Sequence, residues 1–241
     1  MVRTLDRKIL RDLRGSRASL LAIIAVITVG VMCVVALGSA YRNLEESRVA
    51  YYARCRMADF TIEMKKAPVS AALQRIDDVA GISDLRTRIN FAATVDLQDV
   101  AEPVSGRVIS MPPQRDGRLI NDIVLRSGGY FTPVRREEVI VHDPFARAHG
   151  IEPGDTIRLI LNNRKQELHV VGTATSAEFT YLIAPGSIAP DPFRYGVFYV
   201  KERFAEQAFD FEGACNQIVG RLNPGFRELP DSTLQQIERR L

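Results

Sequence analysis

A long uncharged segment near the N-terminus dominates the pattern of hydrophobic and polar positions. From Ala18 to Tyr41 the chain carries no charged side chain, and most positions are apolar. A helix of this length rises roughly 36 Å at about 1.5 Å per residue, enough to cross a hydrocarbon core of about 30 Å with some tilt. The pattern therefore predicts a transmembrane helix over residues 18–41.

Charged residues reappear at Arg42, with no helix-breaking Gly or Pro at this boundary. Residues 42–57 contain neither Gly nor Pro, so we expect the helix to continue outward as a helical stalk. The next elements follow from alternation, helical spacing and Gly or Pro boundaries. They are a strand at Asp59–Met64, a helix from Pro68 that ends at Gly81, one or two strands within 81–97, and a strand at Val104–Met111 before Pro112.

The middle of the chain is richer in turn signals. Gly150 is expected to end a short helix over 144–149, and Asn162-Asn163 suits the positive φ values of a tight hairpin turn. The elements expected here and beyond are strands at Glu138–His142, Thr156–Leu161, Glu167–Val171, Gly196–Val200 and Asn216–Leu222, with helices over 201–209 and from about Pro230.

Strands and helices are mixed without a regular βαβ repeat, which indicates an α+β fold rather than a doubly wound sheet. Because the two outer thirds resemble each other in kind, we expect one subdomain built from both ends, with a mainly β subdomain inserted. The predicted segments are a basic amphipathic segment at 1–17, the membrane helix at 18–41, the stalk at 42–57, the outer subdomain at 58–114 and 210–241, and the insert at 115–209.

Charge is concentrated before the apolar segment. The cations there are Arg3, Arg7, Lys8, Arg11, Arg14 and Arg17, opposed only by Asp6 and Asp12. Lys and Arg in short flanks stay on the cytoplasmic side, so we expect a cytoplasmic N-terminus and an extracytoplasmic main domain. Since the whole chain has a net charge of only +3, the basic balance reflects topology and does not indicate nucleic-acid binding.

A cleaved signal peptide is the alternative interpretation of the same segment. Gly38 and Ala40 are small residues at suitable positions for cleavage. The apolar run, however, is longer than the roughly 7–15 residues usual for signal peptides, which favours a retained anchor. The basic flank also carries Leu5, Ile9 and Leu13 at helical spacing, as in a helix lying on the inner membrane surface.

Composition indicates an ordered globular ectodomain, with 46% hydrophobic and 25% charged residues. Cys33 lies in the anchor, whereas Cys55 and Cys215 lie beyond it. A single pair of cysteines does not make a disulfide framework, so we expect two unlinked thiols. A disulfide between Cys55 and Cys215 is the alternative.

Motifs for catalysis are absent from the sequence: it has no phosphate-binding loop ending in Gly-Lys-Ser/Thr, no Gly-x-Ser-x-Gly and no His-Glu-x-x-His. His142, Asp143 and His149 could share a helical face, but Pro144 interrupts that segment and no fourth ligand is near. We therefore predict no enzyme activity, no metal site and no bound cofactor.

One apolar and aromatic segment allows two interpretations. It is either a buried strand or a surface that docks a partner. Its candidate docking residues are Glu178, Phe179, Tyr181 and Leu182, before Pro-rich flanks.

Three blocks of the sequence resemble the FtsX-like, MacB-type permeases of ABC transporters. They are Leu5–Leu13 (LDRKILRDL) before the apolar helix, Gly150–Ile157 (GIEPGDTI) before the hairpin, and Val171–Phe179 (VGTATSAEF), followed by Tyr181–Ile183 and Pro190–Pro192. The last block is similar to the larger permeases that carry two such units in one chain.

The resemblance implies a periplasmic domain with a porter-like βαβ subdomain and an inserted mainly β subdomain. It also implies a function: a separate cytoplasmic ATPase moves the membrane helices, and that motion reaches the periplasmic domain. The implied setting is a homo- or pseudo-dimeric permease in the bacterial inner membrane, with a possible periplasmic adaptor. Family permeases have at least three further membrane helices, so we expect the sequence to be an N-terminal fragment. The alternative function is a single-pass anchored protein that senses or binds a ligand.

Overall fold

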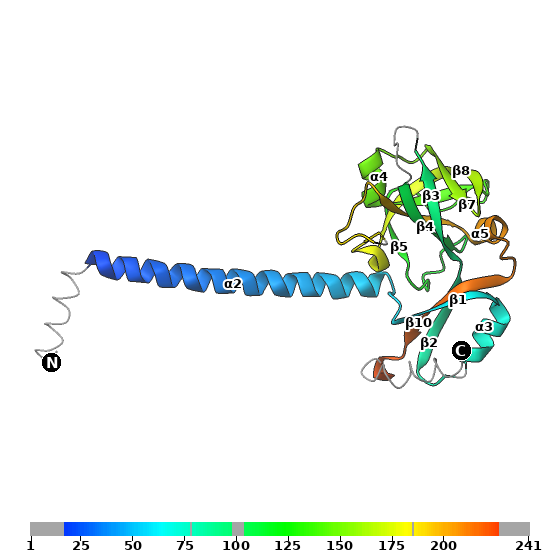
Figure 1. Cartoon of the computed structure of the whole chain (residues 1–241). Coiled ribbons are helices and arrows are strands. Elements are labelled where there is room, and N and C mark those ends of the chain that lie inside the picture. Colours follow the sequence, from blue (N-terminus) through cyan, green and yellow to red (C-terminus); the bar gives the residue numbers. More distant parts are fainter. Residues whose placement is uncertain (1–16, 78, 98–103, 185, 227–241) are drawn as a thin grey trace, which may run out of the picture. The chain divides into compact units, whose positions relative to one another are not determined.

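The computed structural model describes residues 17–77, 79–97, 104–184 and 186–226 of the chain (Figure 1). It divides into two compact units, the first ending at Tyr51 and the second beginning at Tyr52. Cations Arg3, Arg7, Lys8, Arg11 and Arg14, and the helix expected near Pro230, lie outside the described residues.

Helix α2 (Arg17–Arg54) contains the uncharged segment and continues past it without interruption. None of its residues is buried, and its most apolar window has a mean hydropathy of 3.0. Among the described residues it is the one helix long and apolar enough to cross a membrane. Its Thr28 hydroxyl donates to the Ile24 carbonyl at 2.7 Å, so this polar group is satisfied inside the helix, as a lipid environment requires.

The second unit begins with a small sheet made from both ends of that unit. Strands β1 (Phe60–Pro68) and β2 (Ile82–Arg88) both pair antiparallel with β10 (Ala214–Leu222), giving the order β1-β10-β2. Helix α3 (Val69–Asp77) contributes Ala72 and Ile76 to the core of this sheet. The Phe60 ring lies over Gly220, where a Cβ would come within 2.1 Å of it, so this close packing needs glycine.

The segment between β2 and β10 forms a seven-stranded sheet of order β5-β8-β6-β9-β4-β3-β7 (Figure 1). Because β7 also pairs with β8, six of these strands close into a barrel and β5 extends it beside β8. Its strands are β3 (Asn90–Asp96), β4 (Val104–Met111), β5 (Ile123–Gly128), β6 (Glu138–His142), β7 (Thr156–Leu161), β8 (Arg164–Ser176) and β9 (Tyr195–Lys201). Pairs β4–β9 and β6–β8 are parallel, and the other pairs are antiparallel.

Short helices complete the barrel. They are α4 (Asp143–His149), η1 (Ala177–Phe179) and α5 (Glu202–Phe209), with η2 (Pro224–Phe226) after β10. Gly150 ends α4 in the left-handed conformation, and Asn162 and Asn163 turn the β7–β8 hairpin with φ of 47° and 60°. These features confirm the local predictions made from Gly and Asn-Asn.

The expected α+β class is confirmed, and the small sheet is built from β1, β2 and β10, with the barrel strands between β2 and β10 along the chain. Three details differ from expectation, the first being strand β5, which was not predicted. Strands β3 and β4, expected in the outer subdomain, pair within the barrel, because β4 lies parallel to the distant β9. Residues 178–183 form no strand; η1 and an irregular segment replace the buried strand considered for them.

Candidate functional site

The segment directly after α2 has a defined conformation. Arg56 donates its N–H to Ala53 and Met57 donates to Tyr52, at 3.1 and 3.0 Å, which is the hydrogen-bond pattern of a Schellman helix end. Arg56 has φ 47°, a conformation that usually selects glycine at this position. Its guanidinium pairs with Asp84 of β2 at 2.9 Å, so an arginine here gains a contact that a glycine lacks.

Asn121 holds this segment from the barrel side. Its backbone N–H donates to the Arg56 carbonyl at 3.1 Å, and its Oδ1 accepts the Ala58 N–H at 2.7 Å. The next residue, Asp122, donates its N–H to the Cys55 carbonyl at 2.8 Å. Asn121 is 4% exposed and has φ 53°, which asparagine tolerates better than other residues that carry a side chain. Residues 55–58 are therefore tied to the turn before β5 by three hydrogen bonds.

Arg88, at the end of β2, is the centre of a buried polar cluster. Its side chain is 1% exposed and binds both carboxylate oxygens of Glu178, with Nη1 to Oε2 at 2.7 Å. Its Nε donates to Gln217 of β10, whose amide in turn donates to Glu63 of β1 at 3.1 Å. A bidentate pair fixes geometry as well as charge, so β2 and β10 are locked to the η1 turn of the barrel.

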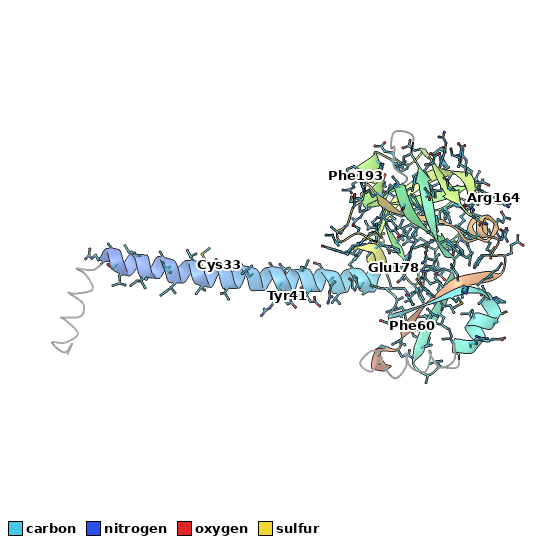
Figure 2. All side chains as sticks on the ribbon, viewed as in Figure 1. Cys33, Tyr41, Phe60, Arg164, Glu178 and Phe193 are labelled. Atoms are coloured by element: carbon cyan, nitrogen blue, oxygen red, sulfur yellow. The ribbon has the colours of Figure 1, made fainter. Side chains whose placement is uncertain are left out.

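Glu178 joins these two sets of contacts. The Asn121 side-chain amide donates to Glu178 Oε2 at 3.0 Å while its carbonyl oxygen is occupied by Ala58. Figure 2 labels Glu178 where the small sheet and the barrel meet. We call Arg88, Asn121, Glu178 and Gln217 the seam cluster, because they bridge the two sheets and reach residues 55–58.

A second arginine of β2 strengthens the same boundary. Arg86 donates to the carbonyls of Ile120 and Ser110 at 2.7 and 2.8 Å. Burial, followed by the charge of Arg88, lowers the pKa of Arg86 to about 10, so it stays protonated at neutral pH. Both arginines point from the small sheet into the barrel because positions two apart in a strand share a face.

The four candidate docking residues do different things. Glu178 is engaged by Arg88, and Phe179 and Leu182 are half-buried against the barrel core that contains Tyr199 and Ile109. Tyr181 is 78% exposed. Residues 180–184 and 186–194, which form no helix or strand, also expose Ile183, Ile188 and Phe193, the last labelled in Figure 2. The structure therefore separates residues that anchor the segment from those that face solvent.

Groups suited to catalysis are not gathered in the described part of the chain. No cluster of three or more His, Cys, Asp or Glu able to hold a metal occurs among the described residues. His142 is buried, and burial lowers its pKa to about 4 despite the neighbouring Asp143, whose carboxylate accepts from Thr173 and pairs with Arg147. No disulfide joins Cys55 and Cys215, and both are buried.

No protein-family model matches the sequence, and no curated protein matches it significantly. Several solved structures are similar. The periplasmic region of MacB from Actinobacillus actinomycetemcomitans has a TM-score of 0.42 and 11% identity over 73% of this chain and 74% of that one. The extracellular domain of the noncanonic ABC-type transporter YknZ from Gram-positive bacteria has a TM-score of 0.43 and 14% identity, and the match covers 75% of this chain and 91% of that one. A permease-protein domain from Porphyromonas gingivalis has a TM-score of 0.40 and 14% identity, and the match covers 75% of this chain and 73% of that one.

Proposed function

We propose that this chain is part of the permease subunit of an ABC-type export or mechanotransmission complex. Helix α2 anchors it in the bacterial inner membrane, and the second unit lies outside the cytoplasm. The exposed apolar surface of α2 supports the anchor, since a soluble protein buries such surface. The three resembling sequence blocks support the class of protein.

The observation that carries the mechanism is the binding of residues 55–58 to the seam cluster. The polypeptide leaves α2 through a hydrogen-bonded turn and is held at once by Asn121, which also holds Glu178. Motion of α2, driven by a separate cytoplasmic ATPase, would thus reach β2, β10 and the η1 turn together. We propose that this is the route by which ATP-driven motion enters the domain.

The exposed part of segment 180–194 is the proposed docking surface for an extracytoplasmic partner such as an adaptor. Tyr181 is its best anchor, because an exposed aromatic side chain supplies contact area at low entropic cost. The neighbouring Glu178 acts as a tether within the domain, since its carboxylate is engaged by Arg88 and Asn121.

Single-cysteine labelling in intact cells tests the orientation. With the native cysteines replaced by serine, Ser16→Cys and Ser47→Cys place one thiol at each end of the apolar segment. A membrane-impermeant maleimide should label Ser47→Cys in spheroplasts and Ser16→Cys only after lysis. Labelling of Ser16→Cys in intact spheroplasts would contradict a cytoplasmic N-terminus.

Hydrogen exchange tests the coupling. The full-length permease, reconstituted with its ATPase subunit, is compared with and without ATP plus vanadate. We expect changed exchange in peptides covering 55–59 and 119–123, with the β7–β8 hairpin at 156–171 as the internal control. Unchanged exchange at 55–59, or an equal change in the hairpin, would favour the alternative of a single-pass ligand-binding protein.

A further inference from the structure

A groove beside the barrel gathers positive charge around exposed apolar atoms. Strands β4 and β9 run parallel with Met111 opposite Lys201, so both end at the same edge of the sheet. Pro113 follows the first strand and α5 follows the second, while the segment between β5 and β6 closes the third side. The resulting cavity of about 590 Å³ falls in the size range of ligand sites. We call it the basic groove, lined by Pro113, Val134, Arg135, Arg136, Glu202 and Arg203 among others.

A buried ion pair fixes the wall of the groove. Lys201 Nζ lies 2.9 Å from Glu138 Oε2, and their side chains are 10% and 1% exposed. Glu138 accepts the N–H and hydroxyl of Thr132, while Lys201 donates to the carbonyls of Thr132 and Arg135. Both ends of Thr132–Arg135 are therefore held, so the side chains between them are positioned before any partner arrives.

The positive charge of the groove is not neutralised by its own walls. Within the described residues, the guanidinium groups of Arg135, Arg136 and Arg203 take part in no ion pair. Arg136 donates to the neutral side-chain amide of Gln207, at 2.9 Å. Glu202 is the acid in the lining, and its pKa is raised by burial and by Glu206.

An exposed apolar side chain lies in the same segment as two of these cations. Val134 is 84% exposed, next to Pro133. Three arginines suit carboxylates, which they bind in a fork geometry, and the valine and prolines suit an apolar side chain. Inorganic phosphate would make no contact with Val134, which disfavours it as the ligand. Three cations are also too few to bind the backbone of a nucleic acid.

We propose that the basic groove binds an acidic peptide segment of a partner protein, with carboxylates on the arginines and an apolar residue against Val134. This site is separate from segment 180–194 and does not depend on the proposed transport function. A docked segment would contact the ends of β4 and β9 and the start of α5, away from residues 55–58.

Fluorescence anisotropy with defined peptides tests the proposal on the full chain in detergent micelles. The probe is a labelled acetyl-EDLFED peptide, with acetyl-EDGSED and acetyl-KRLFKR as controls. We expect saturable binding of the first and at least about tenfold weaker binding of the other two. Equal binding of EDLFED and EDGSED, or displacement of EDLFED by millimolar inorganic phosphate, would overturn the apolar-acidic specificity.

Matched variants locate the site. Arg135→Glu and Arg203→Glu should each weaken binding about tenfold or more, whereas Arg164→Glu, on the exposed hairpin end labelled in Figure 2, should leave it within about twofold. Val134→Ser should weaken binding severalfold, and Ile160→Ser, which changes an exposed apolar side chain of β7 outside the groove, should not. Equal losses in the control variants would overturn the proposal. A dimer seen by sedimentation that Arg135→Glu dissociates would overturn it in favour of a second copy of this chain.

Discussion

Two buried ion pairs in the domain differ in what they connect. Arg88–Glu178 joins the small sheet to the barrel, and through Asn121 it also reaches the residues after α2. Lys201–Glu138 stays within the barrel and holds only the segment beside the basic groove. Both pairs position an exposed segment, but only the first connects the two sheets of the second unit. In the proposed mechanism Arg88–Glu178 would transmit motion, whereas Lys201–Glu138 holds one segment of the barrel in place.

Removing Arg88 should have the largest effect. Arg88→Met leaves Glu178 partly buried without its cation and removes a partner of Gln217, so the free energy of unfolding should fall by about 4 kcal/mol. Urea unfolding of the full chain, followed by the reactivity of the buried Cys215 thiol, measures this loss. The double variant Arg88→Met/Glu178→Leu should recover at least half of it. Equal instability in the single and double variants would show that the pair is not the cause.

Lys201→Met should cost slightly less, about 3 kcal/mol, and its effect should stay local. It leaves Glu138 buried and charged, but the hydrogen bonds from Thr132 remain. Hydrogen exchange should increase at 131–137 while the small sheet keeps its protection. The control is Lys165→Met, which removes an exposed pair with Asp96 and should leave the free energy of unfolding nearly unchanged.

Acid should weaken the barrel through His142. Its pKa falls from 6.5 to about 4 in the folded state, so the unfolded state binds protons more readily. The stabilisation from neutral His142 is present above pH 6.5 and is lost as the pH falls toward 4, by about 2–3 kcal/mol. Unfolding measured across this range in wild type and His142→Phe should differ in slope. Parallel pH profiles would contradict the assignment.

Asn121→Gly should have the smallest effect, about 1–2 kcal/mol. Glycine keeps the positive φ but removes the side-chain bonds to Ala58 and Glu178. Asn162→Gly, at another positive φ, is the matched control and should be nearly neutral apart from its bond to Asp210. Thermal unfolding of the two variants measures the contrast, and equal melting temperatures would argue against the role of Asn121.

Local signals in the sequence were sufficient to predict most helices and strands, but they did not predict the seam cluster. Gly150 and Asn162-Asn163 predict their turns because the required conformation depends on the residue itself. Strand β4 was predicted at its observed bounds, yet its place in the barrel was not, because its partner β9 lies far along the chain.

The seam cluster shows the same limit. Asn121 gives no local signal, since its side-chain partners lie 57 and 63 residues away. Arg86 and Arg88 share a strand face, but two arginines on one face are equally typical of a solvated surface, so their spacing alone does not predict burial. Glu178 was singled out for its apolar neighbours, and its partner on β2 could not be inferred from spacing.

The role of Glu178 in holding residues 55–58 through Asn121 can be tested at a single amide. Hydrogen exchange of the Ala58 N–H is measured in the full chain in wild type, Glu178→Gln and Glu167→Gln, the last altering an exposed carboxylate that pairs with Arg158. We predict about tenfold faster exchange of the Ala58 amide in Glu178→Gln and an unchanged rate in Glu167→Gln. Wild-type exchange at Ala58 in Glu178→Gln would contradict it.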